Sequence, residues 1–575
     1  MTMDRRNFIK GAVAMGGAAA LAGLAGCSSE PEPAIEPGTY TATVPSIKGD
    51  LTLNVSFDGM SITDIRTVSC ADSSVISDVA IESLTRRIVE QQNVEVDAVS
   101  GATMTSMAFK QAVSDCIEQA GGKLRDFQKG SDTVNAKMQA PDEDFDLVVI
   151  GAGIAGMSAA LTAARKSDLK VLLLEKCAFV GGCFRVCGGG MWTMDADINQ
   201  WVGQDCSLDD YVSFMQQRSA PYEIDTELLS NMRAVAGETF MYLMENGLTA
   251  NPATWTFGNP ESQLPCFWSM NNKEHAWETG ESGWADEVHK IVERTGVETR
   301  VNSRAVSLKT DGSAVTGVVV EDLEKIYTVN AKSVVVATGG FTRNKDYIEE
   351  FAPEYADAFA FTAGGDTGDG ITMTRELDVP VVGQGMMGLF GINPSTGYYG
   401  EVGNLVWAAQ ASVNKEGEES GVAGAFYGDT LALLLSQTDS CAYALYDATN
   451  NAVERLEKGV AQGLAAKYDS LDELADGEGI DRTGLQEVAA SRGVSQAPFY
   501  CIVQKPLFIG SIPGLKVNSS CQVENGSGEV VENLYAAGMV MFGNVFNVAY
   551  PCSGTGVGTS NYTGAVAANA ILASL

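Results

Sequence analysis

The chain has 575 residues and a formal net charge of −35, with 45% hydrophobic and 19% charged residues. This length exceeds one ordinary domain, and the apolar content is enough for a large buried core. The acidic balance argues against a nucleic acid partner, which requires clustered Lys and Arg, and disfavours a basic face that binds anionic lipid. A well-solvated surface explains the acidity without any partner.

The cysteine and histidine positions disfavour several kinds of site. The 12 Cys form no C-x-x-C pair, so a zinc or iron–sulfur frame is not expected. The only two His are His275 and His289, which leaves little for chemistry that needs several imidazoles. The 62 Gly permit positive φ and close backbone approach to a ligand, as a fold that cradles a nucleotide requires.

Residues 1–27 have the features of an export signal. Arg5-Arg6 precedes an apolar stretch, residues 11–26, that is too short and too rich in small residues for a spanning helix. The pair resembles a twin-arginine signal, and Leu24-Ala25-Gly26-Cys27 resembles a lipoprotein cleavage box with a lipidated Cys27. An ordinary signal peptide with a chance Cys remains the alternative.

The next segment, residues 28–37, is polar and Pro-rich, and it is expected to be a stiff tether. A lipid on Cys27 would hold the mature protein firmly in the membrane. The expected location is therefore the extracytoplasmic face of the cell membrane.

Residues 38–120 are expected to form a small α+β domain. Residues 40–65 alternate apolar and polar around turn signals, which predicts a small antiparallel sheet. Two helical stretches follow, near residues 77–93 and 104–120, and the run Asp97-Ala98-Val99-Ser100-Gly101-Ala102-Thr103 lies between them.

This run resembles the FMN-binding domain of sodium-pumping quinone reductase subunits and of flavin-fed reductases. The resemblance implies a phosphoester between FMN and Thr103, made by a flavin transferase, with Ser100 and Gly101 beside it. The N–H groups of the helix that starts there suit the phosphate. A plain helix N-cap is the alternative interpretation.

A dinucleotide fingerprint follows the polar linker at residues 121–143. A buried strand, residues 146–150, leads into Gly151-Ala152-Gly153-Ile154-Ala155-Gly156 and a helix, and a second strand ends at Glu175. The glycines let a pyrophosphate rest on the helix N-terminus, and Glu175 is expected to reach a ribose hydroxyl.

Three later segments resemble those of the fumarate reductase/succinate dehydrogenase flavoprotein family: the strand and turn at residues 333–341, Gly368-Asp369-Gly370, and Leu534-Tyr535-Ala536-Ala537-Gly538. The resemblance spans residues 144–575 and implies FAD. The family usually has Glu after Ala-Ala-Gly, whereas this chain has Met539. Besides the fingerprint residues, the implied FAD contacts are Lys176, Gly182, Thr338, Gly339, Gly340, Asp369 and Gly538.

The expected fold is an α/β Rossmann-type FAD-binding domain with an inserted α+β capping domain, preceded by the small FMN-binding domain. No second fingerprint is present, so NAD(P)H is not expected as a direct donor. The FMN domain is the natural entry for electrons from a membrane donor, a quinol or an FMN or haem carrier. The expected boundaries are a signal at 1–27, linkers at 28–37 and 121–143, the FMN domain at 38–120, the FAD domain at 144–384 and 498–575, and the capping domain at 385–497.

The segments that bind dicarboxylates in fumarate reductases have lost their cations here. The corresponding runs are Asn393-Pro394-Ser395-Thr396, Gly417-Glu418-Glu419-Ser420 and Gly510-Ser511-Ile512-Pro513-Gly514. Without those cations a dicarboxylate would be desolvated unpaired, which is costly. Fumarate is therefore not the expected substrate.

Two other stretches resemble 3-ketosteroid dehydrogenases: residues 181–192, with their Gly-rich run and Trp192, and Tyr550-Pro551-Cys552-Ser553-Gly554. The resemblance implies that the Tyr550 hydroxyl and the Gly554 N–H bind a ketone oxygen and stabilise an enolate. A buried Tyr550 with a backbone partner is the alternative. The proton donor stays open among Tyr398, Tyr399 and Tyr427.

The predicted function is a flavin-dependent ene-reductase for a C=C conjugated to a carbonyl, as in an enone, a lactone or a steroid-like compound. The first alternative is an α,β-unsaturated carboxylate reductase resembling urocanate reductases, with Arg343 or Arg375 for one carboxylate. The second is an electron-carrier lipoprotein.

A cysteine pair and an aromatic cluster each have both a structural and a functional interpretation. Cys183 and Cys187 are either small packing residues or a flavin-adjacent redox pair, although their spacing is not that of disulfide reductases. An aromatic cluster suits core or lid packing better than substrate stacking. Its members are Trp255, Phe257, Phe267, Trp268, Trp277 and Trp284.

Overall fold

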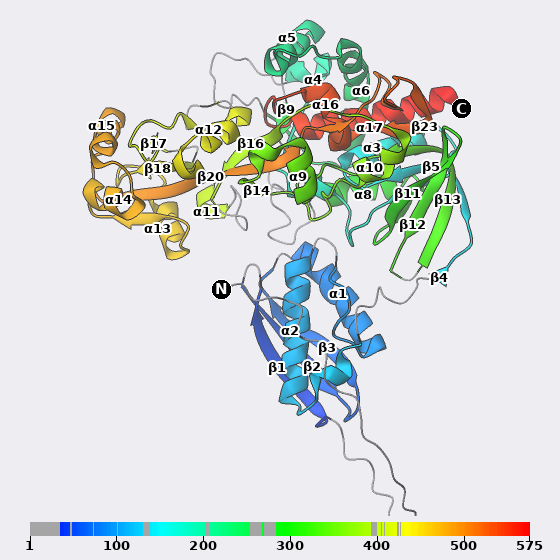
Figure 1. Ribbon diagram of the computed structural model, residues 1–575, viewed down its shortest axis with the longest axis horizontal. Coiled ribbons are helices and arrows are strands. Elements are labelled where there is room, and N and C mark those ends of the chain that lie inside the picture. Colours follow the sequence, from blue (N-terminus) through cyan, green and yellow to red (C-terminus); the bar gives the residue numbers. More distant parts are fainter. Residues whose placement is uncertain are drawn as a thin grey trace, which may run out of the picture.

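The computed structural model describes residues 35–575 except for short internal gaps, and Figure 1 shows a small N-terminal domain beside a larger body. The gaps are 47–48, 73, 100–101, 130–137, 202–206, 254–266, 270–282, 324, 393–399, 404, 407–408, 423–424 and 426. Several predicted residues therefore lie outside the described ones: the signal with Cys27, Ser100, Gly101, Tyr398, Tyr399, Asn393-Pro394-Ser395-Thr396, and Trp255, Phe257 and Trp277 of the aromatic cluster.

The small domain is an antiparallel sheet covered by two helices, which confirms the elements predicted there. Alternate residues of the middle strand, such as Leu53 and Val55, are buried against the helices, as an amphipathic strand requires. The elements are β1 Gly38–Pro45, β2 Asp50–Phe57, β3 Ile62–Cys70, α1 Ser74–Gln91, α2 Thr103–Gln119 and the 3-10 helix η1 Leu124–Phe127.

The larger body is organised around a nine-stranded sheet with the order β10-β6-β5-β13-β12-β11, in which β23 and the short β4 also pair with β13. The pairs β10–β6, β6–β5, β5–β13 and β13–β23 are parallel. The strands are β4 Met138–Gln139, β5 Glu143–Ile150, β6 Val171–Leu174, β10 Glu298–Arg300, β11 Arg304–Asp311, β12 Ala314–Glu321, β13 Lys325–Val336, β22 Gln522–Glu524 and β23 Val530–Ala536.

Helices pack on this sheet and on one another. α3 and α17 approach closely at Gly564, which has no side chain. A Cβ on this residue would lie 2.2 Å from the carbonyl oxygen of Ala155. A three-stranded sheet, β7-β9-β8, lies beside them. The elements are α3 Ile154–Lys166, η2 Gly182–Val186, β7 Gly190–Trp192, α4 Ala196–Trp201, α5 Leu208–Ser219, α6 Thr226–Glu245, β8 Asn251–Ala253, β9 Phe267–Ser269, α8 Trp284–Glu293, α9 Lys345–Phe351, α10 Asp369–Thr374, η9 Gly538–Met541, α16 Gly543–Phe546 and α17 Thr555–Ser574.

A region inserted in sequence between β13 and β23 forms a second sheet at the left of Figure 1. Its long strand β20 pairs with β16 at one end and with β18 at the other, and part of the region has a core of its own. We call residues 386–511 the inserted region. Its elements, with β14 on its sheet, are β14 Phe359–Ala360, β16 Met386–Gly391, α11 Gly400–Gly403, β17 Ala411–Val413, η7 Tyr427–Asp429, α12 Thr430–Leu435, β18 Ala442–Tyr446, α13 Val453–Ala461, β19 Ala466–Tyr468, α14 Leu471–Glu478, α15 Arg482–Arg492 and β20 Phe499–Ser511.

Within the described part of the chain, none of the helices combines the length and apolar character needed to cross a bilayer.

Candidate functional site

The parallel strands bring several predicted cofactor residues to one edge of the sheet. β5, β13 and β23 are adjacent and parallel, so Gly151, Thr338 and Gly538, which follow their carboxyl ends, come together there. The neighbouring β6 ends at Leu174, and Glu175 follows it at the same edge. Ligands of open parallel sheets bind outside the carboxyl ends of the strands.

The three fingerprint glycines have different roles in the structure. Gly151 has φ +105°, and a Cβ on it would lie 2.4 Å from the Ala337 carbonyl oxygen; one on Gly156 would lie 1.8 Å from that of Gly151. Gly153 is different, because its Cβ would meet nothing nearer than the Gly181 carbonyl oxygen at 3.8 Å. The N-terminus of α3 therefore has an open approach over Gly153.

Glu175 is buried beside that helix. Its carboxylate accepts hydrogen bonds from the backbone N–H groups of Ala152, at 3.0 Å, and Cys177, at 2.8 Å. Burial raises the pKa of Glu175 above its ordinary value, and the two amide hydrogen bonds oppose this shift. These bonds hold the carboxylate at the end of β6, where the sequence predicts a ribose contact.

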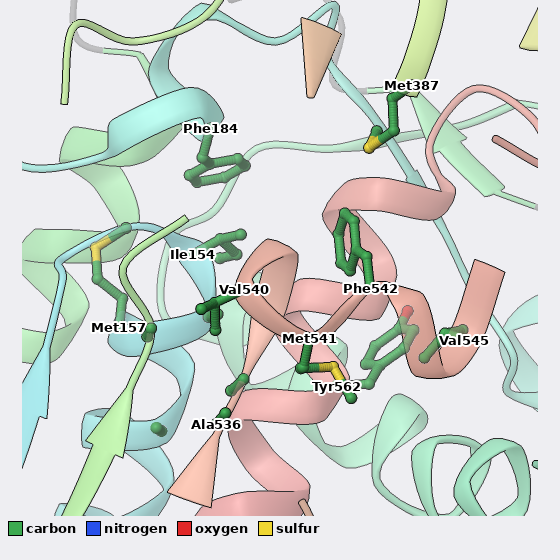
Figure 2. Close-up of a cluster of buried hydrophobic side chains, with 14 of the residues drawn as sticks. Ile154, Met157, Phe184, Met387, Ala536, Val540, Met541, Phe542, Val545 and Tyr562 are labelled. Carbon is green, nitrogen blue, oxygen red and sulfur yellow. The ribbon is translucent and has the colours of Figure 1, made fainter. Parts of the chain in front are cut away.

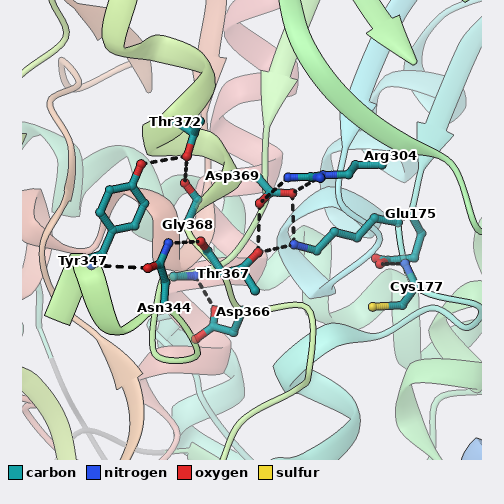
Figure 3. A network of polar contacts seen from close by, with 12 residues as sticks. Glu175, Cys177, Arg304, Asn344, Tyr347, Asp366, Thr367, Gly368, Asp369 and Thr372 are labelled. Atoms are coloured by element: carbon teal, nitrogen blue, oxygen red, sulfur yellow. Dashed lines mark hydrogen bonds and ion pairs between the residues drawn. The ribbon is translucent and has the colours of Figure 1, made fainter. Parts of the chain in front are cut away.

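Lys176 and Asp369 form an ion pair at the same edge, with Nζ 3.0 Å from Oδ2. Figure 3 shows Asp369 between Arg304 and Thr367 in this network. Arg304 lies 3.3 Å from the same carboxylate, and Lys176 also donates to Thr367 at 2.6 Å. Burial favours the neutral acid, but the two cations outweigh it and lower the pKa of Asp369. The roles of Lys176 and Asp369 as FAD contacts stay predictions.

Asp366 is a buried site residue that sequence reasoning missed. Its carboxylate accepts from the N–H of Gly340 at 2.5 Å and from the N–H of Thr342 at 3.2 Å, so it fixes the turn after β13. Gly339 in this turn has φ +77°, where a side chain would be strained. Burial raises the pKa of Asp366. The nearby Gly368-Asp369-Gly370 run was the only local signal for this network.

The residues at this edge fit a dinucleotide such as FAD. The open approach over Gly153 leaves room for a pyrophosphate at the N-terminus of α3, where N–H groups are available. Thr338 Oγ1 is buried without a hydrogen-bond partner in the protein, as expected for a group that awaits a ligand. Gly182, with φ +49°, lies opposite Gly153, and the N–H of Gly538 donates to Thr563 at 3.0 Å.

Gly153→Ala is expected to weaken FAD binding about tenfold or more, equal to about 1.4 kcal/mol, because the methyl group enters the space for the pyrophosphate. Thermal unfolding of the flavin-free protein should be unchanged, since no protein atom lies within 3.8 Å of the new Cβ. Gly156→Ala is the matched control, and its clash with Gly151 should destabilise the flavin-free protein itself. Flavin titration and thermal unfolding measure the two effects. Wild-type FAD affinity in Gly153→Ala would contradict the predicted pyrophosphate position.

A mainly apolar pocket with a cavity volume of about 100 Å³ lies next to this edge. Figure 2 shows Ile154, Phe184, Met387 and Phe542 in the hydrophobic cluster beside it. Among the described residues that line the pocket, none carries a charged side chain. They are Ile154, Cys183, Phe184, Val186, Cys187, Gly188, Gly190, Phe361, Met387, Ile509, Met539, Phe542, Tyr550, Ser553, Gly554, Gly556, Val557 and Ser560.

Tyr550 and Gly554, which the sequence predicts to bind a ketone oxygen, both line this pocket, and that role stays a prediction. Tyr550 is 5% exposed, and its ring lies edge-on to Phe546 at 6.1 Å between centroids. Gly554 is the N-cap of α17 with φ +86°, and its carbonyl accepts from the N–H of Trp192 at 3.1 Å. The N-terminus of α17 therefore faces the pocket, where the helix dipole favours negative charge.

Cys183 and Cys187 also line the pocket, both as free thiols. Burial raises the pKa of Cys183 well above its ordinary value, which keeps this thiol protonated. Both residues therefore lie on the pocket wall and form no disulfide with each other in the structure.

The two arginines considered for a carboxylate lie outside the lining of the pocket. Arg375 pairs with Glu350 at 2.5 Å and lies over the ring of Tyr347. Arg343 donates to the Thr362 carbonyl oxygen at 2.6 Å, and burial lowers the pKa of Arg343. Tyr427 belongs to the short helix η7 of the inserted region.

In the small domain, Thr103 is the first residue of α2 and Ala102 is its N-cap. The preceding run is held by hydrogen bonds: Arg87 donates to the Asp97 carbonyl oxygen at 3.0 Å, and Ser106 accepts from the N–H of Val99 at 3.0 Å. The predicted acceptor therefore lies at a helix start, where N–H groups suit a phosphate.

Comparison with known families supports both cofactors. A model described as an FAD binding domain matches residues 146–557, and one described as an FMN-binding domain matches residues 47–118. The chain is 29% identical to the urocanate reductase of Eggerthella lenta, over 93% of this chain and 94% of that protein.

Solved structures share the fold of the larger body. An open-conformation flavocytochrome c3 fumarate reductase has a TM-score of 0.61 at 22% identity, covering 75% of this chain and 78% of that one. The 3-ketosteroid Δ1-dehydrogenase from Sterolibacterium denitrificans has a TM-score of 0.63 at 18% identity, covering 75% and 100%. The resemblances to the FMN-binding domain, to the fumarate reductase flavoproteins and to the fold of 3-ketosteroid dehydrogenases are thus confirmed. The chain belongs to the FAD-binding-domain family of the fumarate reductases and is an FAD-dependent oxidoreductase with an N-terminal FMN-binding domain.

Proposed function

We propose that the protein reduces a C=C bond conjugated to a neutral carbonyl, as in an enone or a lactone, with electrons that pass from FMN to FAD. The observation that carries this proposal is the pocket that holds Tyr550 and the N-terminus of α17 and has no charged side chain among its described lining residues. A carboxylate there would have only the N-terminus of α17 and no cation among the described lining residues to offset its loss of hydration, whereas a neutral carbonyl needs only hydrogen-bond donors.

The residues of the pocket suit stabilisation of an enolate. The Tyr550 hydroxyl and the Gly554 N–H would donate to the carbonyl oxygen, and preorganised donors at a developing oxyanion are a large catalytic contribution. When bound, FAD supplies the hydride for the β-carbon. FAD would be held by Gly151, Gly153, Gly156, Glu175, Lys176, Gly182, Thr338, Gly339, Gly340, Asp369 and Gly538.

The proton donor for the α-carbon stays open among Tyr398, Tyr399 and Tyr427. We also propose that the parallel sheet with α3 is a Rossmann-type domain and that the inserted region caps the pocket. Met387 and Ile509 of the inserted region support this, because both line the pocket.

An unsaturated carboxylate is the second candidate, and the similarity to a urocanate reductase over nearly the whole chain favours it. A substrate panel separates the two. Reduced protein should be reoxidised by enones and unsaturated lactones, and not by fumarate, urocanate or cinnamate. Reoxidation by carboxylates alone would contradict the neutral-carbonyl proposal. Reoxidation by a protein partner alone would favour the electron carrier.

We further propose an exported protein anchored by lipid on Cys27, with FMN attached to Thr103 by a flavin transferase and electrons supplied by a membrane donor. The Arg5-Arg6 pair and the Leu24-Ala25-Gly26-Cys27 run support export and lipidation. Cys27→Ser should release the protein from the membrane fraction, and mature protein that remains in that fraction would contradict the lipid anchor.

A further inference from the structure

The loop at residues 177–180 connects two parts of the cofactor edge. It follows Glu175 and Lys176 and leads into Gly181 and η2. Cys183, which lines the pocket, comes four residues after Phe179. Four extended residues span at most about 14 Å, so Phe179 lies within that distance of the pocket lining.

Two side chains of this loop pack with the small domain. Ala178 is 6% exposed and belongs to a hydrophobic cluster whose other buried members, such as Val99, Ala102 and Phe109, all come from the small domain. Phe179 is half-buried and packs against the same cluster. Figure 1 shows the small domain adjacent to the larger body, and this loop supplies an apolar contact between them.

The larger body holds this loop in place from the other side. The N–H of Asn302 donates to the Cys177 carbonyl oxygen at 2.9 Å, and Arg185 Nε donates to that of Val180 at 2.8 Å. The guanidinium of Arg185 forms a two-point pair with Asp286 and lies 5.5 Å from the Phe179 ring centroid. These contacts fix the loop in one conformation, so less conformational entropy is lost when the small domain packs on it.

We infer that Ala178 and Phe179 form the docking contact that seats the FMN domain for electron transfer to FAD. The inference rests on the proposed two-flavin relay and identifies the residues that position it. Reduced FMN gives two electrons and FAD accepts them, protons exchange with solvent, and no bond of the protein forms or breaks. An unseated small domain would meet the FAD domain only through its tether, at a lower effective concentration.

The test uses full-length protein loaded with both flavins and carrying Ala178→Lys or Phe179→Ala. Small-angle X-ray scattering should show a larger radius of gyration for Ala178→Lys than for wild type, since the ammonium cannot remain in the apolar contact. Flash photolysis with 5-deazariboflavin, with EDTA as the electron source, should show FMN-to-FAD transfer slowed about tenfold or more because seating is lost. Phe179→Ala introduces no charge and should slow transfer in the same direction.

Val530→Lys is the matched control, because Val530 is an apolar residue of β23 that is 42% exposed and is not part of the small-domain cluster. It should leave both the scattering and the transfer rate unchanged, and acid-released FAD should be equal in all variants. If Ala178→Lys loses FAD, the FMN-to-FAD transfer rate of Phe179→Ala tests the docking contact in its place. Wild-type transfer in the variants would overturn the inference. A protein without covalent FMN would instead refute the relay, and the scattering result would still report on docking.

Discussion

Thr103→Ala is expected to lower the mass of the exported protein by one FMN group and to abolish the flavin fluorescence that survives denaturation. Thr103 is the first residue of α2, where the phosphoester would lie against helix N–H groups, and alanine has no hydroxyl to esterify. The FAD released by acid should be unchanged, because the FAD residues lie in the larger body. Reduction of substrate with a membrane donor should be abolished.

Two control variants make this result specific. Thr103→Ser keeps a hydroxyl and should retain part of the covalent flavin. Ser114→Ala removes another hydroxyl from the same helix, one that donates to the Lys110 carbonyl oxygen at 2.8 Å, and should leave the flavin content unchanged. An unchanged mass in Thr103→Ala would show that FMN is not attached there, and the small domain would then need another role.

Tyr550→Phe is expected to lower kcat about 100- to 1,000-fold with little change in KM, because the lost hydroxyl acts on charge that develops only in the transition state. Tyr550 lines the pocket together with the N-cap of α17, so the ring should still fill its place after the substitution. Steady-state kinetics with an enone and a reduced dye would measure the effect.

Tyr446→Phe is the control for loss of a buried tyrosine hydroxyl. Tyr446 donates to the Leu405 carbonyl oxygen at 2.6 Å and does not line the pocket. Its loss should cost about 1 kcal/mol of unfolding free energy and leave kcat unchanged. A wild-type kcat in Tyr550→Phe would mean that Tyr550 only packs the pocket wall.

Features with strong local requirements were predictable from the sequence. Gly151 and Gly156 could be recognised because no other residue fits their close backbone contacts, and the fingerprint spacing follows from one strand, one turn and one helix. Thr103 could also be placed at a helix start, because the Asp97–Thr103 run and the helix that follows it are contiguous in the sequence.

The positions of Asp366, Cys183 and Cys187 in the site could not be predicted from the local sequence. The Gly368-Asp369-Gly370 run lies near Asp366 in sequence but does not indicate that Asp366 itself fixes the turn after β13. The spacing of Cys183 and Cys187 does not reveal that both face the pocket. Arg343 and Arg375 could be named as cations but not located, and the structure places both outside the pocket lining.

The sequence by itself determined that this protein binds nucleotides, because backbone geometry at the end of a strand restricts which residues can stand there. Only the tertiary structure decided which side chains share the pocket and where the small domain rests. Met387, Ile509 and Tyr550 line the same pocket with Cys183, and Ala178 belongs to the hydrophobic cluster that contains Val99. Such neighbours are far apart along the chain, and burial of apolar surface between distant segments brings them together without a local pattern that records it.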